Sequence, residues 1–98
     1  MKTARHAPKM KRQKVTFIFE STDASKIFLS GDFNEWSPNS HPMKNDGNGI
    51  WSCTMMIPPG NYEYKFIANE KWIEDPRNDQ TCPNVFGTYN SVLDLKPK

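Results

Sequence analysis

The apolar residues of this chain alternate with polar ones at a period of two along most of its length, which is typical of β-strands with one buried face. No stretch repeats its apolar residues at the spacing of a helix. Turn-forming sequences separate the alternating segments, most clearly at 46–49 (Asp-Gly-Asn-Gly) and 58–61 (Pro-Pro-Gly-Asn). Glycine admits positive φ and proline fixes φ, so these residues suit tight reversals of the chain. The pattern predicts antiparallel strands throughout.

About seven short strands fit the alternation, with residues 71–73 as a short strand, 77–86 as a loop and 90–95 as the closing strand. Many short strands joined by hairpin turns predict an all-β fold, an immunoglobulin-like antiparallel β-sandwich of the early-set type. The length of 98 residues is enough for one domain with a modest core. The side chains expected on inward faces are Val15, Phe17, Phe19, Ile27, Leu29, Trp51, Cys53, Met55, Ile57, Tyr62, Tyr64, Phe66 and Ala68.

Charge is distributed unevenly along the chain. Residues 1–14 contain six of the 13 basic residues and no acid, so the remainder holds seven bases against 11 acids, a net charge of −4. We therefore divide the chain into a basic arm, residues 1–13, and a β-sandwich module, residues 14–98. A basic arm can contact nucleic acid or anionic lipid. This one lacks aromatic rings to stack on bases, so we expect a solvated, disordered tail with neither nucleic acid nor membrane as a partner.

The sequence also bears on compartment and cofactors. A run of about 18 apolar residues, needed to span a bilayer, is absent, and no apolar secretory segment follows the basic N-terminus. We expect a cytoplasmic protein. Cys53 and Cys82 are too few for a zinc site, and His6 and His41 stand at no ligand-like spacing to them. Neither a metal nor another cofactor is therefore expected, and in a reducing compartment the two thiols should stay unpaired.

Trp36 and Trp72 stand in polar, turn-rich sequence where a buried side chain would be out of place. Because Trp72 and Ile73 are neighbours in an alternating segment, one of the two must face outward. An exposed indole usually has a flat partner to cover it. Sugar rings, with apolar faces and hydroxyl edges, have a suitable shape. The pair therefore indicates a carbohydrate-binding surface.

Polar side chains accompany the two indoles. Lys65 lies on the outer face of its predicted strand, where its ammonium group can donate hydrogen bonds to sugar hydroxyls. In the segment 86–90 (Phe-Gly-Thr-Tyr-Asn), Thr88 and Asn90 offer donors and acceptors on the same side of an extended chain. A polar loop that enters a strand would explain this segment equally well.

Four motifs occur in order at 30–36 (Ser-Gly-Asp-Phe-Asn-Glu-Trp), 62–66 (Tyr-Glu-Tyr-Lys-Phe), 72–76 (Trp-Ile-Glu-Asp-Pro) and 86–90. Over roughly residues 14–96, the chain resembles carbohydrate-binding module family 48. That family includes the glycogen-binding domain of AMP-activated protein kinase β subunits and the modules attached to branching and debranching enzymes. The resemblance implies a non-catalytic module that binds α-glucans and targets or regulates an associated glucan-metabolising enzyme or kinase complex.

The resemblance also implies roles for six residues. Tryptophans at the positions of Trp36 and Trp72 cradle the glucose rings in glycogen-binding members of the family. Side chains that match Lys65, Thr88 and Asn90 bind the hydroxyls. An apolar residue, typically leucine in the kinase subunits, protrudes where this chain has Phe86. The carbohydrate-binding residues implied are thus Trp36, Lys65, Trp72, Phe86, Thr88 and Asn90.

Two other classes of function compete with this interpretation. Glycoside hydrolysis needs two carboxylates across a cleft. A small sandwich offers no deep pocket for such a pair, so we expect no catalytic residue. An immunoglobulin-like module could instead use the same aromatic surface to bind a protein, but such a surface needs no set of hydroxyl-binding groups around its indoles. The carboxylates near the tryptophans in sequence are Asp32, Glu35, Glu74 and Asp75.

Overall fold

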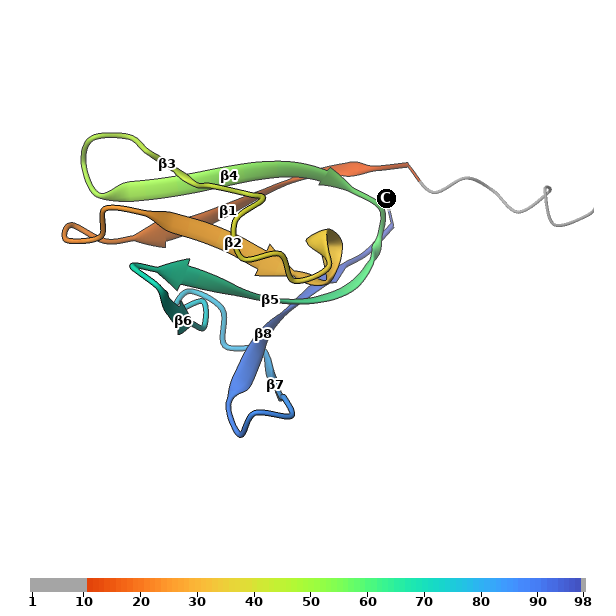
Figure 1. The fold of residues 1–98 in the computed structure, drawn as a ribbon. Helices are drawn as coiled ribbons and strands as arrows, with labels where there is room; N and C mark the ends of the chain where they lie inside the picture. Colours follow the sequence, from red (N-terminus) through yellow and green to blue (C-terminus); the bar gives the residue numbers. More distant parts are fainter. Residues whose placement is uncertain (1–10, 98) are drawn as a thin grey trace, which may run out of the picture.

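Antiparallel strands make up most of residues 11–97, the part of the chain that the computed structural model describes (Figure 1). Of the predicted basic arm, residues 1–10 lie outside the described part, and the first strand begins at Gln13. The elements are β1 (Gln13–Glu20), β2 (Ile27–Gly31), the short 3₁₀ helix η2 (Asp32–Asn34), β3 (Lys44–Asn45), β4 (Ile50–Ile57), β5 (Gly60–Ala68), β6 (Lys71–Ile73), β7 (Thr81–Pro83) and β8 (Tyr89–Leu95).

The strands form two sheets, and the antiparallel β-sandwich predicted from the sequence is confirmed (Figure 1). One sheet has the order β1-β4-β3, and the other has the order β2-β5-β8-β7 with β6 also paired to β5. The strand β5 is central to the second sheet. One of its edges pairs with β2, while the other edge pairs first with β8 and then with β6.

The core lies between the inner faces of the two sheets, where alternation brings the large apolar side chains together. Phe19 of β1 contacts Phe66 of β5 with ring centroids 5.0 Å apart, and Phe17 meets Tyr64 edge-on at 5.1 Å. Trp51 is buried, as predicted, and its indole N–H donates to a backbone carbonyl. The buried cluster consists of Phe17, Phe19, Ile27, Leu29, Met43, Trp51, Tyr64, Phe66 and Ala68.

The segment 77–86 is not all loop, and the prediction was wrong for Thr81–Pro83, which form β7. This edge strand is held by its pairing with β8. Its sequence, Thr-Cys-Pro, lacks a large apolar residue and ends in a proline, which is disfavoured inside a sheet but tolerated in an edge strand. The two-residue strand β3 was also not foreseen, and it forms because Lys44 and Asn45 pair with β4.

The first and last strands begin and end at the same end of the sandwich. The Gln13 side-chain amide donates to the Lys96 carbonyl oxygen at 2.8 Å. Both cysteines are free thiols, Cys53 at a half-buried position where burial raises its pKa. Among residues 11–97, no helix is long and apolar enough to cross a membrane. That part of the chain also holds no cluster of metal-binding side chains.

Candidate functional site

The candidate site lies on the outer face of the five-stranded sheet, the face turned away from the core. Alternation along β5 directs Glu63, Lys65 and Ile67 to this face, because Tyr64 and Phe66 point inward. Directly paired residues share a face, so the register adds neighbours to each of them. Ser30 of β2 lies opposite Lys65, and Trp72 of β6 lies opposite Ile67.

Trp36 and Trp72, the tryptophan pair, come together over this face. Their ring centroids are 6.4 Å apart and their planes are inclined by 39°. Trp72 is 47% exposed, in agreement with the outward position expected for it, while Ile73 packs against the core. Trp36 is only half-buried rather than fully exposed. The pair thus presents two inclined rings, of which Trp72 is exposed and Trp36 is half-buried.

A tight turn after η2 holds Trp36 in place. Glu35 and Trp36 both have φ in the left-handed region, at 57° and 58°. The indole Nε1 donates to Asp32 Oδ1 at 2.9 Å, and Asp32 Oδ2 accepts from the backbone N–H of Glu63 at 2.7 Å. Asp32 therefore ties the turn to β5 and orients the Trp36 ring, a role that was not predicted for it.

Gly31 permits the close approach of this turn to β5. A Cβ atom at Gly31 would lie 2.6 Å from the Glu63 carbonyl oxygen and 2.7 Å from the Tyr64 Cβ. Both distances are too short for a real contact, and neither of the opposing atoms can move freely. The sequence Gly31-Asp32 is therefore needed for the position of Trp36.

Lys65 is on the outer face as predicted, but it is buried rather than solvated, with 7% of its surface exposed. The β7–β8 turn brings Thr88 to it, and Nζ donates to Thr88 Oγ1 at 3.1 Å. This bond uses one of three ammonium N–H groups. The others are left for acceptors such as the hydroxyls of a ligand.

Asn84, which sequence reasoning missed, organises the β7–β8 turn. Its Oδ1 accepts from the backbone N–H groups of Phe86 and Thr88, at 2.9 and 3.2 Å. Its Nδ2 donates to Thr88 Oγ1 at 2.8 Å and to Asn90 Oδ1 at 2.9 Å. The Asn90 amide in turn donates to Glu63 Oε1 at 3.0 Å. Asparagine side chains in turns commonly accept a hydrogen bond from the backbone N–H two residues further along the chain. This tendency could have identified Asn84 from the sequence.

The structure thus joins Lys65, Thr88 and Asn90 in one polar network through Asn84 and Glu63. Asp32 links this network to the tryptophan pair through the Glu63 backbone. Phe86 stands apart from both groups at the tip of the β7–β8 turn, with 85% of its surface exposed. Five of the six expected residues therefore lie on one connected surface, and the sixth projects at its edge.

Further contacts surround this surface. The Glu63 carboxylate near the Cys82 thiol raises the pKa of that thiol. Behind the sheet, the Tyr64 hydroxyl donates to Asp75 Oδ2 at 2.6 Å, and burial together with this bond raises the pKa of Tyr64. The Asp75 N–H donates to Ser91 Oγ at 2.8 Å. Asp75 follows β6 by two residues, so these bonds fix the chain next to Trp72.

Comparison with known proteins identifies the family. The profile described as "Glycogen recognition site of AMP-activated protein kinase" matches residues 13–98. The chain belongs to this family. The predicted resemblance to carbohydrate-binding module family 48 is confirmed, and the family is defined by recognition rather than by catalysis.

Several curated relatives align with the same region. The chain is 28% identical over 81 residues to the human 5'-AMP-activated protein kinase subunit beta-2, covering 83% of the chain and 29% of that subunit. It is 31% identical over 80 residues to the bovine subunit beta-1, covering 81% and 28%. It is also 42% identical over 53 residues to Protein PTST homolog 2, chloroplastic, from Arabidopsis thaliana, covering 54% and 10%. The chain thus spans less than a third of the length of each of these relatives.

Proposed function

We propose that the outer face of the five-stranded sheet binds α-glucans such as glycogen, starch and malto-oligosaccharides. The observation that carries this proposal is the inclined tryptophan pair, with centroids 6.4 Å apart, beside the polar network of Lys65, Thr88 and Asn90. The C–H groups of a pyranose ring are attracted to the electron-rich face of an indole. By analogy with base stacking, each such contact contributes about 1–3 kcal/mol.

The inclination of the rings favours a curved polymer. The α-1,4 linkage bends a glucan chain, so successive glucose rings can meet two planes that differ by 39°. A flat β-linked chain such as cellulose cannot stack on both at once. Two such contacts supply about 2–6 kcal/mol before the cost of association, so we expect weak binding, with a dissociation constant of about 1 mM or above for a short oligosaccharide.

The site is suited to binding rather than to hydrolysis. Glycosidases require two carboxyl groups that flank the scissile bond and are free to act on it. The carboxylates beside the tryptophan pair and the polar network are Asp32 and Glu63, and both are used as acceptors within the protein, from Trp36 Nε1 and Asn90 Nδ2. The glucan is therefore bound and released unchanged.

Binding would serve to hold an associated enzyme at its substrate. The relatives that support this are named as subunits of a kinase, and the chain aligns with less than a third of their length. The partner we infer is a kinase complex or a glucan-metabolising enzyme, which the module targets or regulates. Two unpaired thiols are compatible with a cytoplasmic location for the complex.

A titration of intrinsic tryptophan fluorescence tests the function. Maltoheptaose should give a saturable change, and cellohexaose of similar length should give none. Trp72→Ala should abolish most of the binding, whereas Met56→Ala, an exposed position on the other sheet, should leave it unchanged. If neither sugar changes the fluorescence of folded protein, glucan binding is contradicted. That result would favour the alternative, an immunoglobulin-like module that binds a protein through the same aromatic surface.

A further inference from the structure

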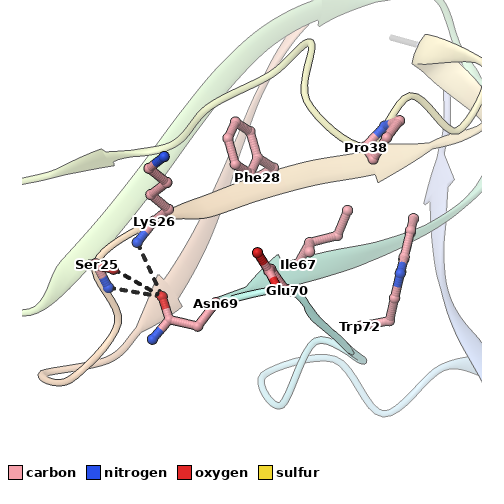
Figure 2. A pocket seen from close by; sticks show the side chains of 8 residues that line it. All are labelled: Ser25, Lys26, Phe28, Pro38, Ile67, Asn69, Glu70 and Trp72. Carbon is pink, nitrogen blue, oxygen red and sulfur yellow. Dashed lines mark hydrogen bonds between the residues drawn. The ribbon is translucent and has the colours of Figure 1, made fainter.

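An open groove continues the outer face beyond the tryptophan pair (Figure 2). Its volume is about 620 Å³, within the range of about 300–1,000 Å³ typical of small-ligand sites. Phe28, Ile67, Pro38 and Trp72 supply its apolar lining. One indole therefore belongs both to the tryptophan pair and to this groove.

The floor of the groove is an apolar strip that crosses three strands. Ile67 of β5 is paired in register with Phe28 on one side and with Trp72 on the other. Because paired residues share a face, the three side chains lie in a row that begins at Trp72. Ile67 is 7% exposed, and Phe28 is half-buried. Pro38 adds a further flat ring at the end near Trp72 (Figure 2).

The β5–β6 turn forms a polar rim along this strip. Asn69 Oδ1 accepts from the backbone N–H groups of Ser25 and Lys26, at 3.0 and 3.3 Å, which fixes the orientation of the amide (Figure 2). These bonds do not use the Nδ2 donors. Glu70 follows in the turn, between Asn69 and Trp72, so that two polar side chains line this side of the groove (Figure 2).

A tight two-residue turn fixes the rim next to the groove. Ala68 pairs with Lys71, so Asn69 and Glu70 alone connect β5 to β6. Their φ values of 49° and 71° are those of the hairpin turn with positive φ at both central positions, which matches the twist of the paired strands. The rim is therefore held in one position relative to Trp72.

We propose that this groove is an extended subsite for the same glucan chain. A glucan chain bound at the tryptophan pair continues past Trp72 and lays a further glucose ring against Phe28, above the buried Ile67, with its hydroxyls near Asn69 and Glu70. The rim carries one basic and one acidic residue, Lys26 and Glu70, which suits a neutral, hydroxylated ligand better than a charged one. This inference rests on the proposed function and adds a preference for long chains over short ones.

Calorimetric titration with maltotriose and maltoheptaose tests the subsite. Maltotriose is short enough to occupy the tryptophan pair alone, whereas maltoheptaose also reaches the groove. Wild-type protein should bind maltoheptaose at least tenfold more tightly. Phe28→Ser should remove most of this difference, about tenfold by analogy with the loss of one stacking contact, and leave maltotriose affinity unchanged. Ile18→Ser, at a half-buried position on the other sheet, is the matched control and should keep the preference.

A second variant, Glu70→Gly, separates a loss of binding from a loss of stability. An Asn-Gly pair suits a two-residue turn with positive φ at both positions, so this variant should be at least as stable as wild type. It should still lose part of the chain-length preference, because the rim acceptor is gone. Equal affinity of wild-type protein for both sugars, or full preference in both groove variants, would overturn the subsite and leave the tryptophan pair intact. Failure of wild-type protein to bind either sugar would overturn the proposed function itself.

Discussion

At the scale of single residues, the side chain of Asn84 determines where two candidate ligand-binding groups point. Its Oδ1 shapes the turn through backbone N–H groups, and its Nδ2 orients Thr88 and Asn90. These are separate tasks performed by two ends of one amide. They can therefore be separated by substitution.

Asn84→Ala removes both tasks, whereas Asn84→Asp keeps the acceptor that shapes the turn and loses the donor. We expect both variants to bind maltoheptaose about tenfold more weakly, because each lacks the charge-neutral donor that positions two hydroxyl-binding groups. Only the alanine variant should increase the hydrogen exchange of the Phe86 and Thr88 amides. Gln80→Ala, at an exposed position shortly before β7, is the control. Wild-type affinity in the aspartate variant would show that the Nδ2 donor has no positioning role.

Cys82 offers a second residue-scale test, based on pH. Its pKa is raised chiefly by the neighbouring Glu63 carboxylate. A raised pKa means less thiolate at a given pH, and the thiolate is the reactive form. Glu63→Gln should therefore lower the pKa of Cys82 and speed its alkylation by iodoacetamide near pH 8. The alkylation rate of Cys53, measured by mass spectrometry in the same sample, should not change, because burial rather than Glu63 raises its pKa. An unchanged rate at Cys82 would refute the contact.

The exposure of Trp72 was predictable from sequence, whereas the burial of Lys65 was not. Trp72 follows the local alternation of its own strand, which the sequence displays. Lys65 also follows the alternation, but its burial depends on a turn that arrives from 23 residues further along the chain and covers it. No local pattern encodes such a long-range contact. Asp32 was missed for a similar reason, since its role depends on the approach of η2 to β5.

At the scale of elements, the joint between β2 and η2 is the part on which the candidate site depends most. Gly31 ends β2 and pairs with Tyr64, and the chain then turns directly above β5. The N–H of Trp36 donates back to the Gly31 carbonyl oxygen at 2.8 Å. The position of the Trp36 ring thus depends on the close approach of two backbone segments, together with the hydrogen bonds of Asp32.

Gly31→Ala should disturb this joint. The added methyl group would overlap backbone atoms of β5, and overpacking of this kind costs about 1–3 kcal/mol. We expect a lower free energy of unfolding in urea and a large loss of maltoheptaose affinity, since Trp36 would move away from Trp72. Gly47→Ala adds a side chain in open space and should leave binding unchanged. Normal affinity in the Gly31 variant would mean that Trp36 does not depend on this approach.

The long strands and the short strand β6 were predicted from the sequence, whereas β3 and β7 were not. The strands β1, β4 and β5 each contain several alternating apolar residues, which is enough for the period to appear. The strands β3 and β7 have two and three residues and exist only through pairing with a longer neighbour. Their formation is a tertiary effect, and local sequence does not determine it.

At the scale of the whole molecule, one core holds both sheets and therefore the candidate site. Phe66 is fully buried at the centre of β5, between Phe19 of the opposite sheet and Tyr64. Its neighbours on the same strand, Lys65 and Ile67, face outward to the candidate site. Stability of the core and geometry of the site are thus coupled through a single strand.

Phe66→Ala should reduce the free energy of unfolding by about 3–5 kcal/mol, a large part of the 5–15 kcal/mol usual for a domain. Because one core supports both sheets, urea unfolding followed by far-UV circular dichroism and by tryptophan fluorescence should give the same midpoint. Met56→Ala, at a site 54% exposed, should change stability by less than about 0.5 kcal/mol. Separate midpoints would show that the two sheets unfold independently.

The bond between Gln13 and the Lys96 carbonyl oxygen has a consequence for assembly. The start of β1 and the end of β8 thus lie side by side. Within a longer polypeptide, such a module would be attached at one point rather than strung between two. It could pivot about that point without stretching its neighbours, so an attached catalytic unit could sample many positions along a glucan granule while the module stays bound.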